Sequence, residues 1–169
     1  TSGSVSSSCS IGNITGNTSS FIGGAIGFNN GNVTNVYATG NVTGGSKSYI
    51  GGFVGQGNTG SITDAYARGT VTGSADAIMG AFSGRTASGR YTDAYYDTTI
   101  AYSVPAVGQG SSANITGLTT EQWRSNGPVT ANSPYAFVNP SLWAAGSPYP
   151  VLSALPYVTI TANGTQVYG

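Results

Sequence analysis

Acidic side chains are the groups in this sequence best suited to acid–base or metal chemistry. The five are Asp64, Asp76, Asp93, Asp97 and Glu121. Asp64 and Asp93 hold equivalent places in two similar segments, "SITDAYA" and "RYTDAYY". If these segments stack as neighbouring strands, the carboxylates lie about 4.8 Å apart. Such a pair could share a proton, bind calcium or cleave a polysaccharide. The alternative is a corner of the fold, where both side chains hydrogen-bond turn amides and Arg68 or Arg90 balances their charge.

The sequence lacks the residue types that most other catalytic and metal-binding sites need. The chain has no histidine, which excludes a Ser-His-Asp or Cys-His arrangement and a His-ligated zinc. Calcium normally takes six or more oxygen ligands, and no acid-dense loop supplies them. We therefore expect no catalytic residue and no cofactor, with Asp64 and Asp93 as the remaining candidates for binding calcium.

An internal repeat organises the chain. The segment from Ser20 to Gly44, "SFIGGAIGFNNGNVTNVYATGNVTG", recurs from Ser48 to Gly73, and a third copy runs from Ala77 to Thr99. A partial copy, "CSIGNITG", comes first. The residues that define the repeat are Gly24, Gly52 and Gly80, then Tyr37, Tyr66 and Tyr95, and finally Gly40 and Gly69. Their fixed period of 28 or 29 residues is typical of a repeat architecture.

The composition of each copy favours strands over helices. Gly, Thr, Val and Tyr dominate, and no apolar residues recur at helical spacing. The second copy predicts three short strands, "YIGGFVG", "SITDAYA" and "TVTG", separated by turns. We therefore predict an all-β fold, a parallel β-helix (β-solenoid) of about three to four coils with a C-terminal cap that contains a short helix. Ladders such as Val33–Ile62–Tyr91 should form, with Val, Ile and Tyr in the centre and Thr and Asn facing water.

Cys9 is the only cysteine, so an internal disulfide is excluded. It stands at the repeat position that Tyr37 occupies in the next copy. Two interpretations stay open. Cys9 is a buried small hydrophobic residue, or its thiol forms a crosslink to another chain.

Charge and hydropathy exclude two classes of partner. Charged residues make up 6% of the chain and the net charge is zero, so the five scattered bases form no electrostatic footprint for nucleic acid. No apolar run approaches the length of a membrane span, so we expect no membrane insertion. Because the chain begins in the middle of a repeat, we expect a fragment or a processed piece.

The second copy, "IGGFVGQGNTGSITDAYARGTVTG", resembles the GLUG-motif repeat of large exported bacterial proteins, many of them adhesins of the filamentous-haemagglutinin type. "AYYDTTIAYSVPAVGQG" and "GLTTEQW" resemble the segment that usually ends such an array, and "YAFVNPSLWAAGSPYPVLSAL" resembles its closing element. "VTITANGTQVYG" is similar to the opening strand of the mostly-bacterial Ig-like domains that often follow. The third copy departs from the pattern, because Ser83 replaces the glycine at Gly55 and the "GTVTG" strand is lost. The resemblance implies a secreted or cell-surface protein.

Three regions are expected: solenoid repeats over residues 1–100, a capping region over 101–156 and an extended strand over 157–169. In the cap, "TTEQW" predicts a short helix with Thr119 or Thr120 as its N-cap and Glu121 in its first turn. A solenoid end exposes strand edges, so Trp123, Trp143 and Tyr149 should pack over the last coil.

The final strand has three interpretations. It links to a neighbour, starts the next domain, or pairs with an open edge of another molecule as a donor strand that builds a filament. Its apolar and polar residues alternate as in a strand. The residues of this candidate assembly strand are Val158, Thr159, Ile160, Thr161, Ala162, Val167 and Tyr168.

These features together predict a non-enzymatic structural module of a bacterial adhesin or fibre. Its expected partners are other copies, neighbouring domains of the same adhesin, and host or environmental glycans. The alternative is a carbohydrate-binding face made of outward Thr, Ser and Asn ladders, and third comes a polysaccharide-cleaving enzyme. Glycosylation stays open at six Asn-x-Ser/Thr sequons, at Asn13, Asn17, Asn32, Asn41, Asn114 and Asn163.

Overall fold

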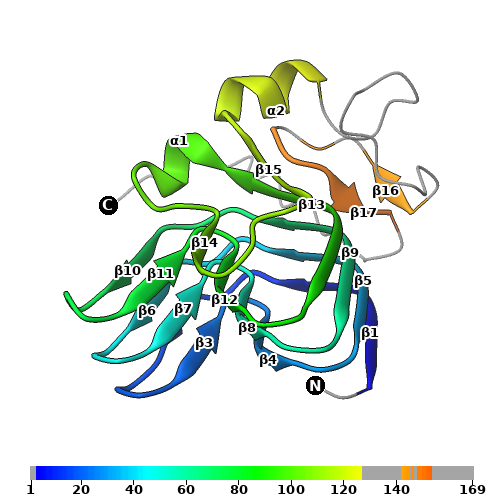
Figure 1. The fold of residues 1–169 in the computed structure, drawn as a ribbon. Helices are drawn as coiled ribbons and strands as arrows, with labels where there is room; N and C mark the ends of the chain where they lie inside the picture. Colours follow the sequence, from blue (N-terminus) through cyan, green and yellow to red (C-terminus); the bar gives the residue numbers. More distant parts are fainter. Residues whose placement is uncertain (1–2, 127–141, 145, 147, 154–169) are drawn as a thin grey trace, which may run out of the picture.

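A computed structural model of the chain describes residues 3–126, 142–144, 146 and 148–153. Its strands wind into a parallel β-solenoid of about three turns with two short helices, which confirms the predicted all-β fold (Figure 1). The assembly strand predicted over 157–169 lies outside the described residues.

Each complete coil contributes four strands, one more than the sequence predicted. The first coil comprises β3 (Phe21–Gly23), β4 (Ile26–Asn29), β5 (Asn32–Ala38) and β6 (Val42–Gly44). The second comprises β7 (Tyr49–Gly51), β8 (Val54–Gly57), β9 (Ser61–Ala67) and β10 (Val71–Gly73). The difference arises because the chain bends at Gly52 and Phe53, which divides the predicted strand "YIGGFVG" into β7 and β8.

Partial coils lie at both ends of the stack. β1 (Ser4–Ser10) and β2 (Ile14–Thr15) precede the first complete coil. The third coil has β11 (Ile78–Gly80), β12 (Ser83–Thr86) and β13 (Arg90–Asp97), and helix α1 (Thr98–Ala101) replaces its fourth strand. A last layer consists of β14 (Val107–Gln109) and β15 (Ile115–Leu118), followed by α2 (Thr120–Asn126), β16 (Trp143–Ala144) and β17 (Val151–Leu152). Helix α2 is the short helix predicted in the cap, whereas the sequence did not predict α1.

Equivalent strands pair in register as four parallel sheets. Their orders are β1-β5-β9-β13-β15, β10-β6-β2, β11-β7-β3 and β14-β12-β8-β4. The predicted ladders Tyr37–Tyr66–Tyr95 and Val33–Ile62–Tyr91 are both present. One equivalence was wrong: Gly80 pairs with Gly51 and not with Gly52. The third coil follows the second at a constant offset, so Ser83 likewise pairs with Val54 and not with Gly55.

Two apolar cores fill the coils. One is formed by β5, β8, β9, β13 and the bends before β8 and β12, and it includes Val33, Phe53, Ile62 and Phe82, with the Phe53 and Phe82 rings stacked 4.9 Å apart. The other lies on β3, β6, β7 and β10 and contains Ile22, Val42, Ile50 and Val71. At the bend between β3 and β4 the backbones of successive coils approach closely, since a Cβ at Gly24 would lie 2.2 Å from the Gly52 carbonyl oxygen of the next coil. Only glycine fits at this position.

Candidate functional site

The sequence predicted that the repeat tyrosines fill the centre of the solenoid, but they lie on its outside. Tyr37 and Tyr66 stack with ring centroids 5.1 Å apart and planes at 2°, yet both are buried. Their neighbours Val36 and Ala38 point into the inner core, so Tyr37 must point outward. The three tyrosines form an outer face that needs a cover, and we call it the tyrosine ladder.

A corner in each long strand fixes this orientation. Asn35, Asp64 and Asp93 have φ values of 56°, 52° and 48°, in the left-handed region that Asn and Asp tolerate better than most residues. A left-handed residue within a strand interrupts the alternation of inward and outward side chains. The backbone at Asp64 and Asp93 therefore forms corners of the fold, as one of the two interpretations of these residues predicted.

The surroundings of these corners are polar and partly buried. Asp64 is 3% exposed, and the Tyr95 hydroxyl lies 3.4 Å from Oδ1 of Asp93. Arg68, expected to balance their charge, instead has its guanidinium 4.4 Å from the centroid of the Tyr149 ring. Among the described residues, no three His, Cys, Asp or Glu side chains gather as a metal site. Calcium at Asp64 and Asp93 stays a prediction.

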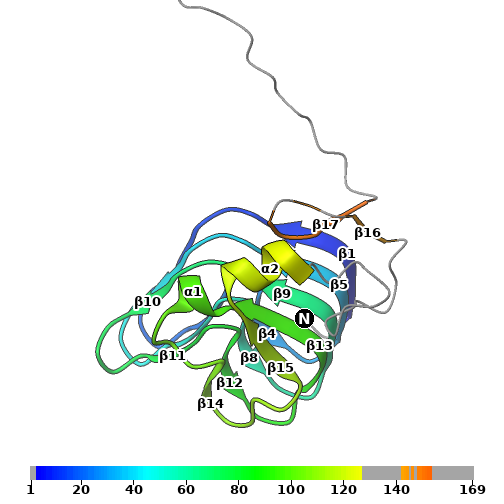
Figure 2. The same ribbon diagram turned by 90° about the horizontal axis from the view of Figure 1, so that it is seen from above.

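The sequence predicted that the cap packs over the last coil. The structure shows instead that it covers the tyrosine ladder from the side. Trp143 lies 6.0 Å from both Tyr37 and Tyr66, and Trp123 lies 5.3 Å from Tyr66 (ring centroids). Figures 1 and 2 show α2 and the β16–β17 pair beside the sheet that contains β5 and β9. The apolar cluster between cap and ladder is buried; it comprises Tyr37, Tyr66, Tyr95, Leu118, Trp123, Trp143, Tyr149 and Leu152.

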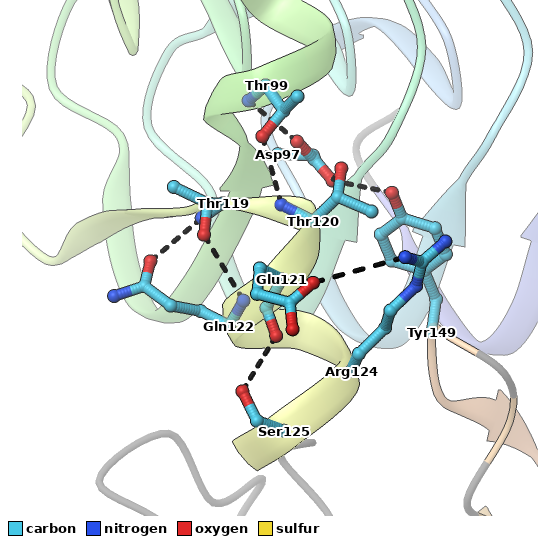
Figure 3. Close-up of polar contacts among 9 residues, drawn as sticks. All are labelled: Asp97, Thr99, Thr119, Thr120, Glu121, Gln122, Arg124, Ser125 and Tyr149. Atoms are coloured by element: carbon cyan, nitrogen blue, oxygen red, sulfur yellow. Dashed lines mark hydrogen bonds and ion pairs between the residues drawn. The ribbon is translucent and has the colours of Figure 1, made fainter.

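The Asp97 side chain accepts four hydrogen bonds, and the two from Thr120 and Tyr149 join the solenoid to the cap (Figure 3). Its side chain is the N-cap of α1 and accepts from the Thr99 and Ile100 amides at 2.8 and 3.1 Å. Its other oxygen accepts from the Thr120 hydroxyl at 2.7 Å and from the Tyr149 hydroxyl. Asp97 is 2% exposed, and hydrogen bonds to a buried carboxylate are among the stronger ones in proteins. Sequence reasoning assigned Asp97 no role, and its position just before α1 was the available signal.

Helix α2 begins with a capping box that the sequence predicted in part. The Thr119 hydroxyl accepts from the Gln122 amide at 3.2 Å, and Gln122 Oε1 accepts from the Thr119 amide at 2.8 Å. Thr119 is therefore the N-cap, and Thr120 is the first residue of the helix. The ion pair of Glu121 with Arg124 spans 4.0 Å at the exposed surface, so it adds little stability (Figure 3).

Two further hydrogen bonds attach the cap to the tyrosine ladder and its corners. The Tyr66 hydroxyl donates to the Pro150 carbonyl oxygen at 2.7 Å, and the Trp143 indole donates to Asn35 Oδ1 at 2.9 Å. Burial raises the pKa of Tyr66 well above its usual value of 10.0. Burial, followed by the hydrogen bond to Asp97, also raises the pKa of Tyr149.

Cys9 occupies the first position of the tyrosine ladder, as predicted, but its side chain is exposed. The expectation of a buried cysteine is wrong because β1 is the edge strand of its sheet in the described part of the chain. Burial, followed by a hydrogen bond with the Cys9 side chain, raises the pKa of Tyr37 to about 12. A crosslink through Cys9 stays a prediction.

Outward ladders of hydroxyl and amide groups are present as predicted. Thr15, Thr43 and Thr72 stand in register, and the last two hydroxyls lie 3.0 Å apart. Asn13 Oδ1 accepts from the Asn41 amide at 2.9 Å, and Asn41 Oδ1 accepts from the Thr70 amide at 3.0 Å. The polar groups of these ladders therefore hydrogen-bond to one another from coil to coil on the outer surface of the stack.

A second outer surface is aromatic and escaped sequence reasoning. Phe21 packs against Phe28 and Tyr49 with ring centroids 5.3 and 5.7 Å apart, and 44% of Phe21 is exposed. The Arg85 guanidinium lies 5.4 Å from the Tyr49 ring centroid. Register places Gln56 between Phe28 and Arg85 on neighbouring strands. These residues, Phe21, Phe28, Tyr49, Gln56 and Arg85, form what we call the aromatic strip.

Comparison with known proteins identifies the repeat. Residues 47–72 match the family model of the GLUG motif, and they span β7, β8 and β9 and reach into β10. No curated protein and no solved structure matches the chain at a significant level. No helix among the described residues is long and apolar enough to cross a membrane. The motif and the solenoid fit a structural extracellular module. The chain therefore contains a GLUG repeat region, which folds as a parallel β-solenoid with a lateral cap.

Proposed function

We propose that the chain is a structural module of a bacterial cell-surface or secreted adhesin or fibre. In this role the solenoid is a stiff element used for adhesion or for self-assembly into filaments. The observation that carries the proposal is the continuous stack itself. Four parallel sheets run through successive coils in register, and β7, β8 and β9 of the second coil pair with the coils on both sides.

The N-terminal end of the stack supports end-to-end assembly. In the described part of the chain, β1, β2, β3 and β4 each form the last strand of a sheet. Their sequences contain no charged residue and no proline, the features that usually protect strand edges from pairing. Ile11 between β1 and β2 is 72% exposed. A further parallel coil or a donor strand could therefore pair here.

Two purified forms, residues 1–169 and 1–156, test self-assembly by size-exclusion chromatography and electron microscopy. Filaments of the longer form alone are expected if the strand predicted over 157–169 pairs with the edges at the N-terminal end. Ile11→Lys should then weaken assembly because it places a charge at that end. Tyr102→Lys is the matched control, since Tyr102 is 87% exposed and follows α1. If both forms stay monomeric, self-assembly of this piece is wrong and a stalk within a longer adhesin remains.

A further inference from the structure

From the aromatic strip we infer a binding site for an acidic glycan on the outer face of the solenoid. The strip crosses neighbouring strands of two sheets, with Phe21 and Tyr49 paired on β3 and β7 and Phe28, Gln56 and Arg85 in one ladder on β4, β8 and β12. It lies away from the cap and its tyrosine ladder. This inference goes beyond the structural role proposed above and does not depend on self-assembly.

The aromatic rings give the site a flat apolar surface. Phe21 and Tyr49 stack with their planes 16° apart, and Phe21 is one of three large hydrophobic residues that are exposed among those described. An exposed aromatic surface with few polar groups around it is typical of a ligand site. The C–H face of a sugar ring is a flat apolar surface that can pack on such rings.

Gln56 supplies a hydrogen-bond acceptor that no protein group uses. Its side chain is 6% exposed, and its buried Oε1 atom has no hydrogen-bond partner in the described structure. Buried polar atoms are nearly always paired, so the unpaired oxygen of Gln56, which stands in register with Phe28 and Arg85, indicates a missing donor. A sugar hydroxyl is such a donor, and the same hydroxyl can accept a hydrogen bond from Arg85.

Arg85 selects for negative charge. Its guanidinium lies over the Tyr49 ring, and it forms no ion pair with any acidic residue of the described chain. All five acidic side chains of the sequence are among the described residues. A guanidinium held on an aromatic ring keeps its outer N–H groups for a carboxylate or sulfate.

A peptide fits this surface less well than a sugar. Tyr49, Gln56 and Arg85 stand on β7, β8 and β12, whose strands bond to both neighbours, and only Phe21 and Phe28 stand on the edge strands β3 and β4. An extended peptide gains most of its affinity from main-chain hydrogen bonds to an open strand edge. The interior of this strip offers no such edge.

Binding of the full chain to acidic polysaccharides tests the inference. The probes are polygalacturonate, alginate, hyaluronate, chondroitin sulfate and polysialic acid, with dextran as a neutral comparison, and affinity electrophoresis is the measurement. At least one acidic probe should bind more tightly than dextran. Phe21→Ala and Arg85→Gln should each weaken that binding by about tenfold, through lost stacking and a lost charged hydrogen bond. Arg90→Gln and Thr43→Ala, which change an exposed base and an exposed hydroxyl outside the strip, should bind like the unmodified chain.

Gln56→Leu separates a binding role from a structural one. The change removes an unpaired buried oxygen at similar volume, so the midpoint of urea unfolding should stay constant or rise. Affinity for the acidic probe should nevertheless fall. Binding of none of the acidic probes, equal binding of dextran, or unchanged affinity in Phe21→Ala and Arg85→Gln would each overturn the inference. Binding of a polyproline peptide in place of every polysaccharide would overturn it as well.

Discussion

The Trp143 indole donates a hydrogen bond to Asn35 Oδ1 across 2.9 Å, although 108 residues separate the two in the chain. Asn35 is the left-handed corner of β5, and Trp143 begins β16. Both side chains are buried. A corner that turns the repeat tyrosines outward is thus bonded directly to the segment that covers them, so coil and cap should unfold together.

Loss of the Trp143 indole N–H should destabilise the whole domain. Trp143→Phe keeps an aromatic ring but removes the donor, and we expect the free energy of unfolding in urea to fall by about 1–3 kcal/mol. Asn35→Gly removes the acceptor while allowing the positive φ. In a double-mutant cycle the two changes should be coupled by about 0.5–1.5 kcal/mol. Strictly additive losses would show that this hydrogen bond contributes nothing.

The Tyr149 hydroxyl should contribute to the attachment of the cap. Tyr149→Phe removes one of the donors to the buried Asp97 carboxylate, and the expected loss is about 1.5–3 kcal/mol in urea unfolding. Tyr102→Phe is the control, because that ring is 87% exposed and should change stability by less than about 0.5 kcal/mol. Equal stability of Tyr149→Phe and Tyr102→Phe would mean that Asp97 does not depend on this contact.

Much of the solenoid could be predicted because the repeat itself encodes it. Equivalent residues such as Tyr37 and Tyr66 must meet once coils of constant length stack, so the period alone gives the register. The error at Gly80 came from a local ambiguity, since adjacent glycines at 51 and 52 both fit the pattern. The fourth strand per coil was missed because its boundary is a bend inside an apolar run, where composition does not change.

The side of the sheet on which the tyrosines lie could not be read from alternation. A left-handed residue at Asn35, Asp64 and Asp93 reverses that alternation, and a polar residue at the same place in each repeat was its only signal. The contacts of Asp97 with Thr120 and Tyr149 could not be predicted either. They join non-repeating segments 23 and 52 residues apart, and no periodicity places those segments side by side. In the aromatic strip, the repeat does pair Phe21 with Tyr49, but the contact of Phe21 with Phe28 joins two strands of one coil, and no periodicity predicts it.

Substitutions at Asp93 should separate its backbone role from its charge. Asp93→Gly and Asp93→Ala both remove the carboxylate, but only glycine adopts φ near 48° without strain. We expect Asp93→Ala to be less stable than Asp93→Gly by about 1–2 kcal/mol in urea unfolding. A rise in the melting temperature of the unmodified chain with calcium, absent in both variants, would instead favour an ion bound at Asp64 and Asp93.

Stability should fall at alkaline pH because buried tyrosines must stay neutral in the folded state. The pKa of Tyr37 is raised to about 12, and the pKa values of Tyr66 and Tyr149 are raised above 10.0 as well. Unfolded tyrosines lose their protons near pH 10, before the folded ones do. Their contribution is therefore complete below about pH 10 and is lost as the pH rises towards 12. The chain has no histidine, and Lys47 is its only lysine.

The free energy of unfolding in urea, measured at intervals from pH 9 to pH 12, tests this dependence. Tyr37→Phe should show a shallower decline than the unmodified chain, because one of the shifted groups no longer titrates. Tyr102→Phe should decline as steeply as the unmodified chain, since its ring is exposed in the folded state. A constant free energy up to pH 12, or equal slopes in all three proteins, would contradict the burial of the tyrosine ladder beneath the cap.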